Sequence, residues 1–246
     1  KNPWDEQFRQ QKRKCIEQAD AIICISETTK NELEYYYSKP YPARVIPIGY
    51  SPVFEKLDPG QPSADVGIRT SKPFILYVGG RTQYKNFMVV LQAYSRWAHR
   101  HEIDLVVVGG PWSPEEKALL TELNISDRVI LLTGSNDAEL CRLYNQAVAF
   151  IYPSLFEGFG IPLLEAMACG CPIVASHIPS TPEVAQDCPW YFEPQAVDDL
   201  VEKLDLVLDR EKSQSKIARG FEIARCYSWD RTARETLDLY HSLVTA

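Results

Sequence analysis

Two glutamates around a glycine-containing loop are the clearest chemical signal in the sequence. In the stretch SLFEGFGIPLLEAMACG, Glu157 precedes Gly158 and Gly160, and Glu165 follows after seven intervening residues. Pro162 suits the first turn of a helix, because its missing N–H would have no partner there. Glycines beside a helix start let backbone N–H groups approach a ligand, and the helix dipole favours negative charge at that end. The pattern therefore predicts a phosphate-compatible site.

The spacing of the two glutamates predicts contacts with different parts of one extended ligand. If a helix begins near Gly160, Glu165 lies about 7 Å further along its axis, at roughly 1.5 Å per residue. A sugar nucleotide fits this description, with one carboxylate on sugar hydroxyls and the other on ribose hydroxyls. The same spacing also fits a solvated loop glutamate and a helix glutamate without a ligand.

A second group of candidate residues follows an expected strand. In VGGRTQYKNF, the strand over residues 74–78 runs into Gly79 and Gly80, and Arg81 and Lys85 come next. Ligands of open α/β sheets bind beyond the carboxyl ends of the strands. The planar fork of Arg and the mobile charge of Lys together suit a diphosphate, although both residue types are also common as plain surface charges.

Short apolar runs rich in β-branched residues alternate with longer amphipathic stretches, which predicts an α/β protein with a parallel sheet covered by helices. The expected strands are residues 21–25, 44–48, 74–78, 104–108, 129–132, 149–152 and 173–175. The clearest helix is expected over residues 86–100, where apolar residues recur at three- and four-residue steps. The expected helices after the last of these strands are residues 197–208, 212–227 and 229–243.

A domain boundary is expected near residues 50–73, which are rich in Pro, Gly, Ser and Asp and show no periodicity. Residues 1–52 hold two expected strands and one good helix after Ser26 as N-cap, too little for an independent core. We interpret them as the last piece of a first domain with its linker. Residues 53–227 then form a second, larger domain, and residues 228–246 a final helix.

Composition excludes several classes of function. The chain has 246 residues and a net charge of -7, which argues against broad binding to nucleic acid, because that needs a basic surface. Its seven cysteines include no C-x-x-C pair, so neither a disulfide framework nor a zinc site is indicated, and a reducing cytoplasm is expected. No apolar run approaches the roughly 20 residues that span a bilayer. Lys12, Arg13 and Lys14 could contact an anionic membrane or form a solvated helix face.

Taken together, these segments resemble the retaining glycosyltransferases of family 4 (group 1). The resemblance rests on the pair Arg81 and Lys85, on the E-x7-E pattern from Glu157 to Glu165, and on the stretches ADAIICIS and VIPIGYSPVF, and it covers nearly the whole chain. It implies a GT-B fold, with two Rossmann-like domains facing a cleft, each a parallel sheet with helices on both faces. Residues 53–227 would be the nucleotide-sugar donor domain, and residues 228–246 would return toward the acceptor-side first domain, most of which is missing from this chain.

The resemblance also assigns functions to the matching residues. It implies that Arg81 and Lys85 bind the donor diphosphate, that Glu157 contacts the transferred sugar and that Glu165 contacts the ribose. Arg81, Lys85 and Glu157 are the expected catalytic residues, and Glu157 positions the sugar without being assigned as a nucleophile. The full set of expected donor-binding residues is Gly79, Gly80, Arg81, Lys85, Ser135, Asn136, Glu157, Gly158, Phe159, Gly160, Ile161, Glu165 and Ser176.

The implied reaction moves a hexose from a nucleoside diphosphate sugar to a hydroxyl of a glycan or lipid-linked glycan acceptor, with retained configuration. Same-face attack and a covalent sugar intermediate both remain open. Protein cations would stabilise the leaving diphosphate, so no metal or other cofactor is expected. The stretch YVGGRTQYKNF is similar to mannosyltransferases of bacterial polysaccharide biosynthesis, which makes GDP-mannose the first candidate donor. With most of the first domain missing, the chain is expected to bind donor and to transfer poorly.

Other functions compete with this interpretation. A dinucleotide-dependent oxidoreductase would need G-x-G-x-x-G, but Gly158-Phe159-Gly160 is followed by Ile-Pro-Leu. A non-catalytic nucleotide-sugar-binding module and a sugar-nucleotide epimerase or phosphorylase on the same fold remain alternatives. The expected location is cytoplasmic, with peripheral contact at the inner face of the membrane as an alternative.

Overall fold

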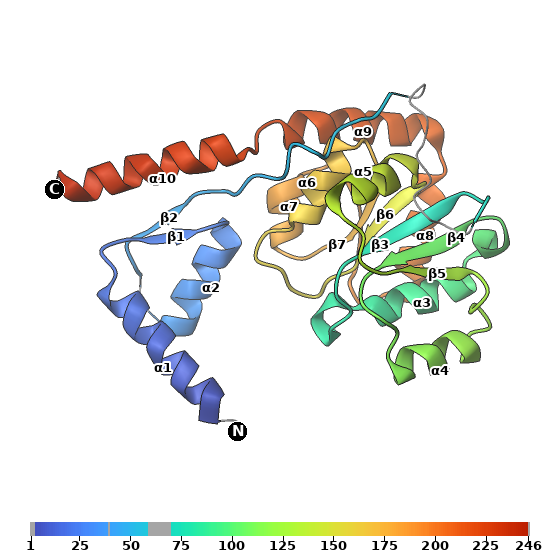
Figure 1. The fold of residues 1–246 in the computed structure, drawn as a ribbon, viewed down its shortest axis with the longest axis horizontal. Coiled ribbons are helices and arrows are strands. Elements are labelled where there is room, and N and C mark those ends of the chain that lie inside the picture. Colours follow the sequence, from blue (N-terminus) through green and yellow to red (C-terminus); the bar gives the residue numbers. More distant parts are fainter. Residues whose placement is uncertain (1–2, 39, 59–69, 246) are drawn as a thin grey trace.

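Six parallel strands form the centre of the protein in a computed structural model, which describes residues 3–38, 40–58 and 70–245 (Figure 1). The strands lie in the order β5-β4-β3-β6-β7-β8. Their bounds are β3 (Phe74–Val78), β4 (Asp104–Val108), β5 (Val129–Leu132), β6 (Ala149–Tyr152), β7 (Ile173–Ser176) and β8 (Trp190–Phe192). The expected α/β class is confirmed, and so are five of these strands. The strand β8 was not expected, because its three residues are too few to show a pattern.

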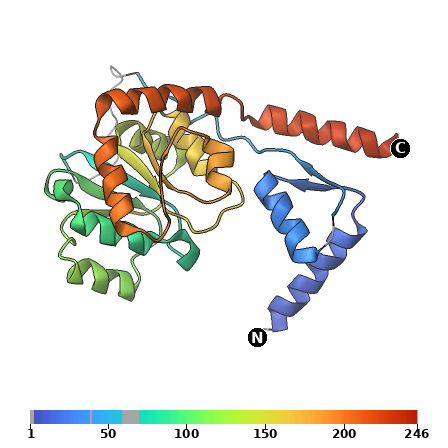
Figure 2. The same ribbon diagram turned by 180° about the vertical axis from the view of Figure 1, so that it is seen from behind.

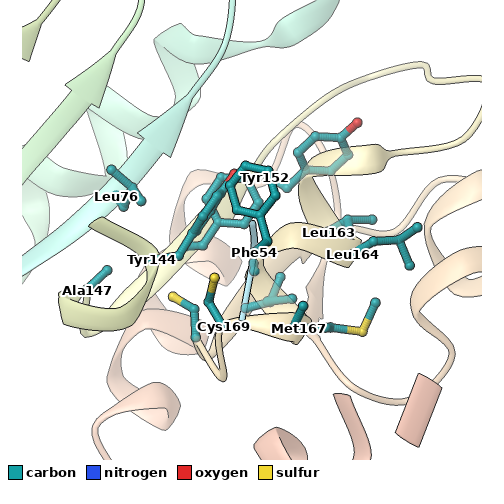
Figure 3. Packing of buried hydrophobic residues seen from close by; sticks show 14 of the residues in the cluster. Phe54, Leu76, Tyr144, Ala147, Tyr152, Leu163, Leu164, Met167 and Cys169 are labelled. Carbon is teal, nitrogen blue, oxygen red and sulfur yellow. The ribbon is translucent and has the colours of Figure 1, made fainter. Parts of the chain in front are cut away.

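Helices cover both faces of this sheet because its strands are apolar on both sides. Along β3, Phe74 and Leu76 face one core, whereas Ile75 and Tyr77 face the other. The first core is covered by α5 (Asp137–Gln146), α6 (Ile161–Ala168), α7 (Ser180–Ala185) and α9 (Arg210–Ala224). The second is covered by α3 (Phe87–Arg96), α4 (Pro114–Glu122) and α8 (Val197–Val207). Figure 3 shows Leu163, Leu164 and Met167 of α6 beside Tyr144 and Phe54 in the first core.

The expected helix over residues 86–100 is divided at Trp97. The helix α3 ends at Arg96, and a 3-10 helix spans Ala98–His101. Trp97 has an extended backbone, with ψ at 131°, and its buried indole N–H donates to Asp205 of α8. The helix therefore ends early because Trp97 turns into the second core.

The N-terminal segment forms a separate small sheet (Figures 1 and 2). It contains α1 (Pro3–Gln18), β1 (Ile22–Cys24), α2 (Glu27–Tyr37) and β2 (Ala43–Val45), with β1 parallel to β2. Ser26 is confirmed as the N-cap of α2, because its side chain accepts from the N–H of Thr29. The helix α1 adds to the one expected after Ser26, and it contains Lys12, Arg13 and Lys14, for which a solvated helix face was one of the two interpretations. Of the expected boundary region, residues 59–69 lie outside the described residues.

The last helix, α10 (Trp229–Val244), runs back toward this segment (Figures 1 and 2). Its Thr232 hydroxyl donates to the carbonyl of Pro47 at 2.8 Å. None of the helices in the described part of the chain is long and apolar enough to cross a membrane.

Candidate functional site

The candidate residues lie where the strand order changes direction. From β3 the chain proceeds outward to β4 and β5, and it then returns to place β6 on the opposite side of β3. The loops after β3 and β6 therefore lie side by side at a topological switch point, which is the common ligand site of open α/β sheets. Residues 79–86 form the first loop and residues 153–160 the second.

An ion pair joins these two loops. The Nζ atom of Lys85 lies 2.6 Å from Oε1 of Glu157, and the Ser154 hydroxyl donates to the same oxygen at 2.6 Å. The side chains of Lys85 and Glu157 are 23% and 14% exposed, so the pair is partly accessible to solvent. The structure thus brings together one cation and one carboxylate of the expected site.

The loop after β6 leads directly into the start of α6. The helix begins at Ile161 with Gly160 as N-cap and Pro162 in its first turn, as the sequence predicts. Gly160 has φ at 114°, which a residue with a side chain rarely adopts. The backbone N–H groups of Phe159, Gly160 and Ile161 donate to no acceptor among the described residues. These unpaired N–H groups at a helix start are candidate donors to an anion.

Glu165 lies on α6 against a buried tyrosine of α5. The Tyr144 hydroxyl donates to Oε2 of Glu165 at 3.2 Å. Burial raises the pKa of Glu165 from 4.5 to about 7, although the bond from Tyr144 opposes this shift. Its carboxylate is therefore partly protonated at neutral pH in the free protein.

Arg81 does not share the surroundings of Lys85. Its guanidinium binds Glu116 of α4 through Nε at 2.7 Å and Nη2 at 3.3 Å, and Nη2 also donates to the carbonyls of Gly110 and Pro111. The side chain is only 6% exposed, and its Cζ atom lies 4.6 Å from the centre of the Trp112 ring. Nη1 of Arg81 is the one nitrogen of the guanidinium without a hydrogen-bond partner among the described residues, so the expected contact of Arg81 with a diphosphate stays a prediction.

The two glycines after β3 leave space for a ligand. A Cβ at Gly79 or Gly80 would meet no heavy atom within 4 Å, and Gly79 has φ at 133°. The carbonyl of Gly80 accepts from the Tyr77 hydroxyl at 2.6 Å, which fixes the turn. The glycines therefore permit close approach to the backbone beside Lys85.

The remaining candidates, Ser135, Asn136 and Ser176, differ in where their side chains lie. Ser135 and Asn136 follow β5, and Asn136 forms a capping box with Glu139 at the start of α5. Ser176 is fully buried, and its hydroxyl lies within hydrogen-bonding distance of the carbonyls of Tyr152 and Ser154. The expectation that the Ser176 side chain contacts the donor is therefore corrected. Ser176 thus stabilises the start of the loop after β6.

Some residues of the site were not expected. The Asn86 amide donates to the carbonyls of Pro153 and Pro194 at 3.0 and 2.6 Å, and Asn86 has φ at 54°. It thus ties the loop after β3 to those after β6 and β8. Asn is a residue type that tolerates this left-handed backbone, so YKNF held a weak signal for a turn. No local pattern in the sequence indicates that Ser154 or Tyr144 belongs to the site.

Neither a metal cluster nor a reactive thiol is evident in this region. Within residues 3–38, 40–58 and 70–245, no three His, Cys, Asp or Glu side chains are grouped to hold a metal ion. Cys169 and Cys171 are buried, and burial raises the pKa of both thiols. These cysteines are packing residues of the first core.

Comparisons with known proteins agree with this architecture. The chain matches the family described as glycosyl transferases group 1 over residues 62–220. It is 29% identical over 238 residues to the O-antigen chain mannosyltransferase B of Escherichia coli, covering 93% of this chain and 62% of that protein. It is also 29% identical over 248 residues to the MMP alpha-(1->4)-mannosyltransferase of Mycolicibacterium hassiacum, covering 96% and 57%.

A solved structure shows the same fold. The sucrose-phosphate synthase of Thermosynechococcus elongatus has a TM-score of 0.79 with this chain at 24% identity, covering 95% of this chain and 61% of that one. The chain therefore spans about three fifths of the length of these relatives. Because the family match extends over more than half of the residues, the protein belongs to the group 1 glycosyl transferase family, with a fold of the GT-B type.

Proposed function

We propose that the protein transfers a sugar from a nucleoside diphosphate to an acceptor hydroxyl with retention of configuration. One observation carries this proposal: Glu157, paired with Lys85, lies in a loop that runs directly into the open start of α6. A carboxylate accepts bonds from sugar hydroxyls, whereas a cation and unpaired N–H groups bind phosphate. The loop cluster therefore suits a ligand that carries both.

In this proposal, the diphosphate lies against Lys85 and the N–H groups of residues 159–161. Negative charge grows on the diphosphate as the bond to the sugar breaks. Fixed donors at that position stabilise the transition state more than the ground state. Lys85 also holds Glu157 in place through their ion pair, so that Glu157 can orient the sugar. No metal takes part in the proposal.

The nucleoside would extend from the diphosphate toward α5 and α6. Glu165 would accept bonds from the ribose hydroxyls, and Ser135 and Asn136 would lie near the base. The open backbone at Gly79 and Gly80 would face the donor sugar or its phosphates. GDP-mannose is the first candidate donor, because both relatives above are named mannosyltransferases. The acceptor would be a glycan or lipid-linked glycan.

The proposed location in the cell follows from the proposed donor and acceptor. The cytoplasm would supply the nucleotide sugar, and a lipid-linked acceptor would bring the protein to the inner face of the membrane. Lys12, Arg13 and Lys14 are exposed on α1, where they would contact anionic lipid.

Calorimetric titration of GDP, GDP-mannose, UDP and UDP-glucose tests the donor site. We expect GDP and GDP-mannose to bind more tightly than the uridine ligands. Release of free GDP is then measured with and without a mannan-type acceptor. Acceptor-dependent release supports transfer, whereas binding without transfer to any acceptor supports a non-catalytic module. Failure of every nucleotide sugar to bind would refute the proposal.

A further inference from the structure

We propose that the first turn of α2, residues 26–29, is a positioning element of the donor site. Ser26 and Thr29 hold the carbonyl of Gly158, and Glu183 of α7 holds the turn itself. This inference rests on the proposed function, because Gly158 directly follows Glu157 and precedes the open start of α6. Ser26, Thr29 and Glu183 are positioning residues in this scheme, since each acts through Gly158 or through the turn itself.

Two hydroxyl groups converge on one carbonyl oxygen. The Ser26 hydroxyl donates to the Gly158 oxygen at 2.5 Å, and the Thr29 hydroxyl donates to it at 3.1 Å. A carbonyl oxygen has two lone pairs, so these bonds use its full accepting capacity. Ser26 is 1% exposed, so water does not compete for its bond. The donors come from more than 120 residues away in the sequence.

This contact orients a group that the donor would use. The Gly158 carbonyl and the Phe159 N–H belong to one planar trans peptide unit, in which they point in opposite directions. Because the carbonyl is drawn toward α2, the Phe159 N–H points away from α2. That N–H is one of the three unpaired donors at the start of α6. Fixing the carbonyl therefore fixes the direction of a proposed phosphate ligand.

The turn is itself held by a carboxylate from the six-stranded unit. Oε1 of Glu183 accepts from the Glu27 N–H at 2.6 Å, and Oε2 accepts from the Thr28 N–H at 2.9 Å and its hydroxyl at 2.7 Å. The Ser26 oxygen accepts from the Thr29 N–H at 2.9 Å. The first three N–H groups of α2 are thus satisfied, two of them by a side chain 155 or more residues away.

The fit at Gly158 separates this arrangement from an ordinary helix cap. A serine cap alone needs no contact with another loop. Here the two backbones approach so closely that a Cβ at Gly158 would lie 3.2 Å from the Thr29 hydroxyl oxygen. A side chain at Gly158 would therefore push the Thr29 hydroxyl away by a few tenths of an ångström. The N-terminal segment and the site loop are shaped to each other.

Hydrogen–deuterium exchange of the ligand-free chain tests the contact directly. Thr29→Val removes one donor to Gly158 but keeps the side-chain shape and the Ser26 cap. Ser26→Ala removes the other donor, and Glu183→Gln loosens the turn. The Leu155 and Leu163 amides report on the loop, because they donate to the carbonyls of Tyr84 and Gly160. We expect each variant to speed exchange at these two amides about tenfold, and Thr29→Ser to restore slow exchange. Unchanged exchange at these amides in Thr29→Val would overturn the proposal.

A matched control separates loss of a cap from loss of this contact. Ser228 caps α10 by accepting from the Arg231 N–H at 3.2 Å, and it has no bond to the site loop. Ser228→Ala should leave exchange at the Leu155 and Leu163 amides unchanged. If it speeds exchange there as much as Ser26→Ala does, the effect is general loosening and the proposal is wrong.

Binding of GDP then tests whether the contact matters for the site. We expect Thr29→Val to weaken the binding of GDP about tenfold at an unchanged melting temperature. Thr29→Ser should bind GDP as the wild type does. If exchange rises in Thr29→Val but GDP affinity does not fall, the positioning function is overturned. If the wild type binds no nucleotide, the proposed function fails, and the exchange experiment still decides whether the turn holds the loop.

Discussion

The Nζ atom of Lys85 lies 2.6 Å from Oε1 of Glu157, and this pair joins the loops after β3 and β6. The two residues are 72 positions apart in the sequence. An ammonium group has three donors, and the pair uses one of them. Lys85 can therefore orient Glu157 and bind a phosphate oxygen at the same time.

Lys85→Gln should weaken the binding of GDP by about tenfold to a hundredfold, since a charge-assisted hydrogen bond contributes about 1.5 to 3 kcal/mol. Calorimetry measures this change. Lys203 is a matched control, because it is a similarly exposed lysine paired with Asp199 on α8. Equal affinities of Lys85→Gln and Lys203→Gln would remove Lys85 from the proposed site.

Arg81→Gln should instead lower the free energy of unfolding, by about 3 kcal/mol, because it leaves the buried Glu116 carboxylate without its cation. Urea denaturation measures this loss. Arg96→Gln is the control, because Arg96 pairs at 3.1 Å with Asp198 at an exposed position, and its loss should cost less than about 1 kcal/mol. At a temperature where Arg81→Gln is folded, a tenfold or larger loss of GDP affinity would show that Nη1 of Arg81 also binds the diphosphate, whereas an affinity within threefold of the wild type would remove Arg81 from the proposed site.

The sequence predicts the strands of the large sheet well because short apolar runs rich in β-branched residues are typical of buried parallel strands. The bounds of β3, β4, β5 and β6 agree with those expected. The short strand β8 has only Trp190–Phe192, and a run of three residues carries no period. The same reasoning predicts the two loops at the switch point, since chemistry-bearing residues follow the ends of two strands.

The partners of the site side chains could not be predicted in this way. Arg81 and Lys85 are four positions apart, and their spacing suggests one diphosphate-binding pair. In the structure, Arg81 forms an ion pair with Glu116, whereas Lys85 forms one with Glu157. The approach of Arg81 to Glu116 depends on Gly109, where a Cβ would lie 2.6 Å from Nη1 of Arg81. Contacts of this kind are set by packing between distant loops, and no local pattern encodes them.

Glu165→Gln should stabilise the free protein at high pH. The folded pKa of Glu165 is about 7, above its ordinary value of 4.5, so the folded state binds this proton more tightly than the unfolded state. The resulting stabilisation is fully present below pH 4.5 and is lost as pH rises through 7. Above pH 7 the wild type carries the cost of a buried charge, at most about 3 kcal/mol, at about 1.4 kcal/mol per pKa unit.

The measurement is denaturant unfolding of both proteins at pH 5 and pH 8. The Gln side chain can still accept from the Tyr144 hydroxyl, so the variant keeps that contact. We expect the free energy of unfolding of Glu165→Gln to exceed that of the wild type at pH 8 and to be similar to it at pH 5. A variant that is equally destabilised at both pH values would show that the shape of the Glu165 side chain, and not its charge, determines stability.

The two glutamates should also differ in which ligand they affect. Glu165→Gln should weaken GDP and GDP-mannose alike, because the ribose is present in both ligands. Glu157→Gln should leave GDP affinity within about threefold and weaken GDP-mannose tenfold to a hundredfold, because only the complete donor carries the sugar hydroxyls that Glu157 would bind. The Gln at position 157 can still accept from the Ser154 hydroxyl and Lys85, so the loop should keep its shape. Calorimetry with both ligands on both variants measures the four affinities at pH 8, where Glu165 is ionised in the wild type. If Glu157→Gln weakens GDP as much as Glu165→Gln does, Glu157 contacts the diphosphate region and the proposed contact with the sugar is wrong.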